Sequence, residues 1–197
     1  MKANIPYHIG CSSWNVPSRI GTFYTKKSKS NDLIGQYASV FNSVEICKNI
    51  REFPTAGELQ KWDEDTPEGF KFCVNFPSEL THKQLLENVE GQALAFVDSF
   101  EPIRKKLGPF LISLPHNFDF SLLKRLESLL SALPKTYSYA VEVQHEDFYD
   151  HGNSEHKLEL LLKSYGIDRI ISDTRKLHVT KANSPGWSLE AGIRQTP

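Results

Sequence analysis

Six short apolar segments recur along the chain, and segments with the periodicity of amphipathic helices lie between them. Their starts are about thirty residues apart, which is roughly the length of one βαβ unit. Strands that alternate with helices in this way predict an α/β protein built on a parallel sheet. The expected strands are residues 7–11, 43–47, 71–76, 109–114, 139–143 and 168–172.

Capping signals mark the ends of several expected helices. Thr55 is followed three residues later by Glu58, which is the capping-box pattern of a helix start. From residue 175 onward no clear periodicity remains, so we expect one domain over residues 1–174 and an irregular tail over residues 175–197. The other expected caps are Asn31, Ser121 and Ser154 at helix starts and Gly166 at a helix end.

Composition excludes several classes of protein. The 197 residues include 23 basic and 24 acidic side chains, and this near-neutral balance gives no argument for broad electrostatic binding to nucleic acid or membranes. No apolar run approaches the ~18 residues that a membrane span requires, and we expect no membrane partner. The three cysteines have no CxxC spacing, so we expect reduced thiols and a cytoplasmic protein.

Familiar catalytic motifs are missing from the chain. The sequence contains no GxGxxG after a strand, no GxxxxGK[ST], no HExxH and no GxSxG. Dinucleotide-binding, P-loop, zincin and hydrolase-elbow functions therefore have no support from motifs.

Polar residues interrupt the apolar segments near their carboxyl ends. Strand alternation places Glu45 on the opposite face from Val44, and Glu142 on the opposite face from Val141. Parallel strands are normally buried on both faces, so a charge inside one is costly unless it is paired or binds a metal. Barrels and doubly wound sheets bind ligands at the carboxyl ends of their strands, so we expect a functional site there. Further polar residues near these ends are Ser12, Asn75, Ser113, Ser172 and Asp173.

Histidines also follow the expected strands. His82, His116 and His145 come shortly after the third, fourth and fifth strands. Together with carboxylates they would suffice for a His/carboxylate metal site or for general acid–base catalysis. A divalent metal is compatible with this set, although the sequence does not identify one. The carboxylates that would join them are Glu45, Glu142 and Asp173.

A structural interpretation of the same residues stays open. Glu45 and Glu142 can form buried ion pairs with residues such as Lys71 or Arg51, and such pairs need no catalytic role. His116 lies in a Pro-His-Asn sequence that is typical of a turn.

Short motifs spread over residues 7–174 resemble, in their order, the DUF72 or YecE-like family of TIM-barrel proteins, which has no established biochemical function. The motifs include Ile9-Gly10-Cys11-Ser12-Ser13-Trp14, Gly21-Thr22-Phe23-Tyr24, Asn42-Ser43-Val44-Glu45-Ile46, Pro67-Glu68-Gly69-Phe70-Lys71-Phe72, Ala140-Val141-Glu142 and Ser172-Asp173-Thr174.

The resemblance implies a TIM-type (β/α) barrel with a pocket at the carboxyl ends of its strands. The resemblance also implies which residues line this pocket. Of these we assign Glu45, His82, Glu142 and His145 to catalysis, and Trp14 and Asp173 to substrate binding. Similarity to endonuclease IV and xylose isomerase type barrels favours metal-assisted acid–base chemistry on a phosphodiester or sugar-type substrate. The partner would then be a small molecule or a nucleic acid. The alternatives are a non-catalytic binding or interaction protein and a truncated, inactive family member.

The length of the chain and the residues of the expected pocket both depart from the family pattern. A TIM barrel uses ~250 residues for eight βα units, so this chain has room for about six parallel strands. The barrel would be incomplete, and its exposed strand edges favour self-association. Asn75 and Gln144 stand where the family commonly has Lys and Arg, which weakens the case for an anionic substrate.

Overall fold

Five parallel strands form a single sheet in the computed structural model, which describes residues 7–29, 32–46, 53–149 and 151–173. The sheet has the order β1-β2-β3-β4-β5, so each strand pairs with the next strand along the chain. A doubly wound sheet reverses its strand order part of the way across, whereas sequential order is that of a barrel wall. The α/β prediction is therefore confirmed, with five strands in the described residues. The strands are β1 (Ser43–Ile46), β2 (Lys71–Asn75), β3 (Leu107–Leu114), β4 (Tyr139–Val143) and β5 (Asp168–Arg169).

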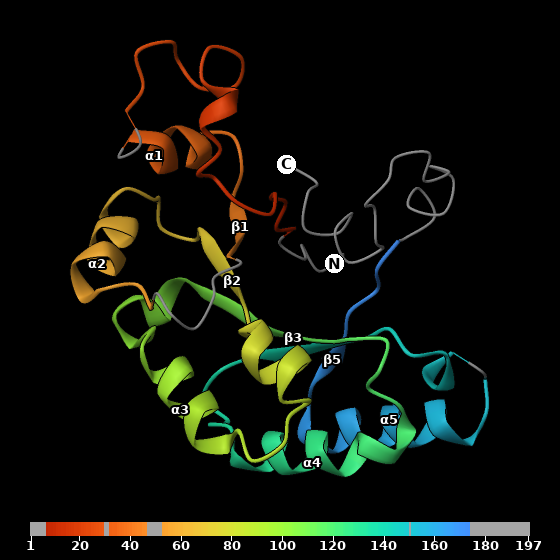
Figure 1. Ribbon diagram of the computed structural model, residues 1–197. Helices are drawn as coiled ribbons and strands as arrows, with labels where there is room; N and C mark the ends of the chain where they lie inside the picture. The colour runs from red at the N-terminus through yellow and green to blue at the C-terminus, as the bar shows by residue number, and fades with distance from the viewer. Residues whose placement is uncertain (1–6, 30–31, 47–52, 150, 174–197) are drawn as a thin grey trace, which may run out of the picture.

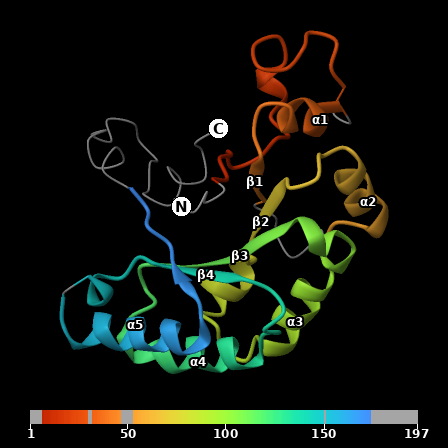
Figure 2. The same cartoon turned by 180° about the vertical axis from the view of Figure 1, so that it is seen from behind.

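Helices follow one another along the outer side of the curved sheet (Figure 1), and the view from behind shows the same arrangement (Figure 2). One helix precedes β1, and each later helix connects two successive strands. Among the described residues, no helix is long and apolar enough to cross a membrane. The helices are α1 (Leu33–Ala38), α2 (Ala56–Glu64), α3 (Glu90–Asp98), α4 (Leu123–Ala132) and α5 (Asn153–Tyr165).

The core lies between the sheet and the helices. Alternate strand residues such as Phe72, Phe110 and Val141 are completely buried. Phe72 stacks on Trp62 of α2 with ring centroids 5.9 Å apart, and Phe110 lies 6.0 Å from Phe96 of α3. One face of the sheet is thereby committed to the helices, and the intervening strand residues lie on the opposite face, which we call the open face.

The first expected strand, residues 7–11, is wrong as a strand, because these residues adopt no regular structure. They nevertheless run beside β1, where the Glu45 backbone N–H donates to the Cys11 carbonyl at 3.0 Å. The outer side of this segment is uncovered: Tyr7 is 80 % exposed and Ile9 is 65 % exposed. A segment that pairs on one side only lacks the second ladder that would complete a buried strand. The last expected strand, 168–172, is shortened to the two residues of β5.

Local capping signals have mixed outcomes. Thr55 and Glu58 form the expected capping box at α2, and Gly166 ends α5 with a left-handed φ of 66°. Ser121 and Ser154 are wrong as caps: Leu122 and Gly152 occupy those positions at α4 and α5. Both are one or two residues from the expected sites, the usual uncertainty of a helix boundary. Asn31, Arg51 and the expected tail 175–197 lie outside the described residues.

Candidate functional site

Four polar side chains lie at the carboxyl ends of successive strands on the open face of the sheet. Glu45 and Glu142 are each the penultimate residue of their strand, and Asn75 and Ser113 occupy the last and penultimate positions of β2 and β3. Each neighbours a buried residue of the opposite face, as alternation requires. We call Glu45, Asn75, Ser113 and Glu142 the polar row.

Two contacts connect the polar row across strands. The Asn75 amide donates from Nδ2 to Glu45 Oε1 at 2.6 Å. Ser113 and Glu142 are direct partners in the β3–β4 register. All four residues are partly exposed, so they remain accessible to a ligand.

The alternative interpretation of the two carboxylates, buried ion pairs with Lys71 or Arg51, is tested only for Lys71, because Arg51 lies outside the described residues. Lys71 is at the opposite end of β2 and donates to the carbonyls of Lys105 and Leu107, at 2.9 and 3.3 Å. Glu142 forms no ion pair with any other residue in the described part of the chain. Its carboxylate therefore has no counter-ion there to explain its position on the open face.

Cys73 lies opposite Glu45 in the β1–β2 register. Burial raises the pKa of the Cys73 thiol, and the nearby Glu45 carboxylate raises it further. A thiol with a raised pKa stays protonated at neutral pH and is a poor nucleophile. Cys73 therefore lines the sheet as a neutral side chain beside the polar row.

His145 is held in the loop that follows β4. Its Nδ1 accepts a hydrogen bond from the Asp147 backbone N–H at 3.2 Å and lies 3.4 Å from Asp147 Oδ2. Hydrogen bonds from Ser121 lower the pKa of Asp119, and the nearby His145 lowers it further. His145 thus lies among the acidic side chains of this loop and is oriented by the Asp147 backbone.

His82 occupies a different position, in the π-helical turn Glu79–Lys83 after β2, where its Nδ1 lies 2.8 Å from Thr81 Oγ1. His82 and His145 therefore follow strands that are separated by β3. Within residues 7–29, 32–46, 53–149 and 151–173, no group of three His, Cys, Asp or Glu side chains is arranged to hold a metal ion.

Neither of the two expected substrate-binding residues belongs to the polar row. Trp14 packs edge-on against Trp62 of α2 at 4.9 Å and against Phe72 at 6.3 Å, so its ring belongs to the helix-covered side of the sheet. Asp173 lies in the exposed segment after β5. The roles assigned to all six site residues stay predictions.

Two open pockets lie near β4 and β5. The first, of about 500 Å³, is lined by His116, Gln144, His145, Glu146 and Tyr149 and follows the ends of β3 and β4. Sequence reasoning did not select Tyr149, because it lies in a loop without periodicity.

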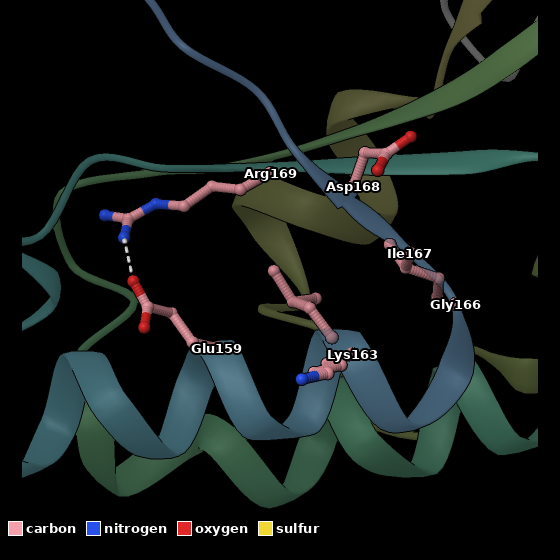
Figure 3. A pocket seen from close by; sticks show the side chains of 7 residues that line it. Glu159, Lys163, Gly166, Ile167, Asp168 and Arg169 are labelled. Atoms are coloured by element: carbon pink, nitrogen blue, oxygen red, sulfur yellow. Dashed lines mark ion pairs between the residues drawn. The ribbon is translucent and has the colours of Figure 1, made fainter.

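The second pocket, of about 400 Å³, lies between α5 and β5 (Figure 3). Arg169 crosses its edge, and its Nη1 lies 3.9 Å from Glu159 Oε1 and 2.9 Å from Glu155 Oε1. Arg169 at this second pocket is therefore paired with two acidic residues of α5.

The sequential parallel sheet, the outer helices and the polar row define an α/β protein of the (β/α) type with a candidate ligand site at the carboxyl ends of its strands. The family follows from comparison with known proteins. Residues 8–193 match the family described as "Protein of unknown function DUF72", and the chain belongs to that family.

Relatives share the fold but extend further. The chain is 28 % identical over 177 residues to the UPF0759 protein YecE of Escherichia coli K12, a match that covers 90 % of this chain and 62 % of the relative. It is also similar to the crystal structure of a DUF72 family protein from Thermotoga maritima, with a TM-score of 0.71, 25 % identity, and coverage of 84 % of this chain and 64 % of that one. A DUF72 family protein from Enterococcus faecalis gives a TM-score of 0.65 at 20 % identity, covering 84 % and 60 %. This chain therefore spans less than two thirds of the length of these relatives.

Proposed function

We propose that the polar row binds a neutral, polyhydroxylated substrate of the sugar type and supplies acid–base groups to it. The observation that carries the proposal is the presence of two carboxylates, Glu45 and Glu142, with an amide and a hydroxyl between them on one open face. Carboxylates accept hydrogen bonds from sugar hydroxyls, and the amide and the hydroxyl can both donate and accept. These four groups together match the hydrogen-bonding surface of a sugar.

The charge of the row favours a sugar over a phosphodiester. None of its four members is a cation, and Lys71 of the same face donates to two carbonyls at the other end of β2. A phosphodiester would meet two negative side chains there, and their repulsion would need a divalent cation to offset it. The donor set of the described residues gives no support for such a cation.

The two carboxylates have different surroundings, which supports a division of roles. Glu45 is held by the Asn75 amide at 2.6 Å and is suited to orienting a substrate hydroxyl. Glu142 has no ion-pair partner in the described part of the chain and is suited to exchanging a proton with the substrate. His145, two residues beyond the end of β4, would assist Glu142 from the same end of the strand.

Calorimetric titration of the whole chain tests this proposal with D-xylose, D-glucose, glucose 6-phosphate and an abasic-site DNA duplex, each with and without Mg²⁺. We expect the neutral sugars to bind, and Glu142→Gln to weaken that binding roughly tenfold, since hydrogen bonds to a charged acceptor are the stronger ones. The matched control is Glu127→Gln on the exposed side of α4, which should bind like the unmodified chain. Binding of DNA or phosphosugar alone, or unchanged sugar binding by Glu142→Gln, would refute the proposal.

Self-association is a second candidate, and it rests on the exposed edge of the sheet. Ile171, just after the two-residue strand β5, is 96 % exposed, and a bare strand edge with apolar side chains favours pairing with another chain. We propose a second copy of this chain as the partner. Light scattering after size exclusion should show a dimer that Ile171→Lys disrupts, whereas Leu160→Lys on α5 should leave it intact. A monomer at every micromolar concentration tested would contradict it.

We also propose a cytoplasmic location. Cys11 and Cys73 are free thiols in the described part of the chain, as expected in a reducing compartment. Alkylation of intact cells followed by mass spectrometry should find both thiols reduced, and a disulfide on either would contradict the location.

A further inference from the structure

The pocket at the ends of β3 and β4 is formed by residues that follow the polar row closely in the sequence. β3 ends at Leu114 and β4 at Val143, and the pocket begins with His116 and Gln144, shortly beyond these ends. Gln144 is two residues after Glu142. The pocket therefore adjoins the carboxyl end of the strand that carries Glu142.

Tyr149 has a fixed position in this pocket. Its hydroxyl donates to the Val143 carbonyl at 2.5 Å, and the Arg169 guanidinium lies 4.8 Å from its ring centroid. Arg169 is itself fixed, because it donates to the Phe148 carbonyl at 2.6 Å and to Glu155 Oε1 at 2.9 Å. Tyr149 nevertheless remains 52 % exposed.

A half-exposed aromatic ring that is held in place offers a ligand apolar contact area at little cost in conformational entropy. Around Tyr149 the pocket places an amide, two imidazoles and a carboxylate, from Gln144, His116, His145 and Glu146. A sugar ring presents an apolar C–H face and a rim of hydroxyls. The aromatic face and the polar side chains of the pocket complement these two surfaces in turn.

The pocket between α5 and β5 in Figure 3 lacks this combination. No aromatic side chain lines it, and Arg169 pairs with Glu155 and Glu159. The two pockets therefore differ in the ligand that they suit, although Arg169 lines one of them and contacts the Tyr149 ring of the other.

We infer that the pocket around Tyr149 is a second sugar subsite, in which the Tyr149 ring packs against a sugar ring next to the one bound at Glu142. This inference rests on the proposed function of the polar row and deepens it, because it makes the preferred ligand a disaccharide or a longer chain. Arg169 is a positioning residue, which holds the Tyr149 ring without contacting the ligand.

Calorimetry and ligand-observed NMR on the whole chain test the subsite with xylobiose and cellobiose against D-xylose and D-glucose. We expect at least one disaccharide to bind more tightly than its monosaccharide, and Tyr149→Ala to weaken disaccharide binding roughly five- to tenfold, the range typical of one aromatic contact. Monosaccharide binding should change little. Tyr149→Phe keeps the ring and should retain most of the affinity, and Tyr7→Ala, at another exposed tyrosine, is the matched control.

The possible results separate the subsite from the polar row. Sugar binding that depends on Glu142, with no preference for a disaccharide or no effect of Tyr149→Ala, would overturn the subsite and leave the proposed function intact. Disaccharide binding that depends on Tyr149 and not on Glu142 would support the subsite and refute the role of the row. An unmodified chain that binds no sugar would overturn both.

Discussion

Asn75 at the end of β2 donates its side-chain amide to Glu45 Oε1 on β1, across 2.6 Å. Asn75→Asp replaces this donor with a second carboxylate. We expect the free energy of unfolding at pH 7 to fall by about 1–3 kcal/mol, because a favourable hydrogen bond becomes a repulsion between like charges. Part of the loss should be recovered below about pH 4, where one shared proton relieves the repulsion.

Urea unfolding of Asn75→Asp at pH 7 and pH 4 provides the measurement. Asn117→Asp, in an exposed turn, adds the same charge away from Glu45 and should change stability little. Equal effects of the two substitutions would show that the contact between Asn75 and Glu45 contributes nothing specific.

Gly10 brings the segment beside β1 unusually close to it. A Cβ atom at Gly10 would lie 2.0 Å from the Ser43 carbonyl oxygen, which is backbone and cannot rotate away. Gly10→Ala should therefore lower the free energy of unfolding by about 1–3 kcal/mol, the usual cost of forcing extra volume into a packed site. Gly57→Ala in α2 meets nothing within 4 Å and should raise it by about 0.5–1 kcal/mol through helix propensity. Thermal unfolding of both variants tests these two expectations. If Gly10→Ala leaves the stability unchanged, residues 7–11 are not held against β1.

Tyr37 connects the same segment to the sheet. Its hydroxyl accepts from the Cys11 backbone N–H at 2.6 Å and donates to the Ser43 carbonyl at 2.9 Å. Tyr37→Phe removes both bonds and should cost about 1–3 kcal/mol, since a buried carbonyl and a partly buried N–H lose a partner. Hydrogen exchange should become faster at the Cys11 amide and stay unchanged in α4. If the Cys11 amide keeps its protection, the hydroxyl is not what holds this segment.

Most strands of the sheet are predictable from sequence, and the segment beside β1 is not. The expected strands at 71–76 and 139–143 agree with β2 and β4 to within one residue, because buried central strands are continuous apolar runs that alternation organises on two faces. Residues 7–11 also contain apolar side chains but pair on one side only. Whether a segment becomes a strand there depends on a neighbour elsewhere in the fold, which local sequence does not specify.

The candidate site is likewise predictable from the sequence only in part. Alternation alone places Glu45 and Glu142 on one face, but the contact of Asn75 with Glu45 depends on the stagger between β1 and β2. Tyr149 has no periodic signal, and its position depends on Arg169, twenty residues later in the chain. Trp14 shows the converse: a motif identifies the residue, and only the structure shows that its ring packs on Trp62.

Glu155 links the acid stability of the protein to Arg169. Its pKa is lowered from 4.5 chiefly by the hydrogen bond from Arg169, with the His151 backbone N–H adding to the effect. A carboxyl group whose pKa is lower in the folded state stabilises the fold above its unfolded pKa, and this contribution is lost as the pH falls through the folded value. Glu155→Gln should therefore reduce stability at pH 7, and its difference from the unmodified chain should shrink as the pH falls below 4.5. Urea unfolding across this range tests the expectation, with Glu159→Gln, whose carboxylate lies 3.9 Å from Arg169 and is 58 % exposed, as the control with a weaker effect. A difference that stays constant with pH would mean that the pair of Glu155 and Arg169 does not contribute to acid stability.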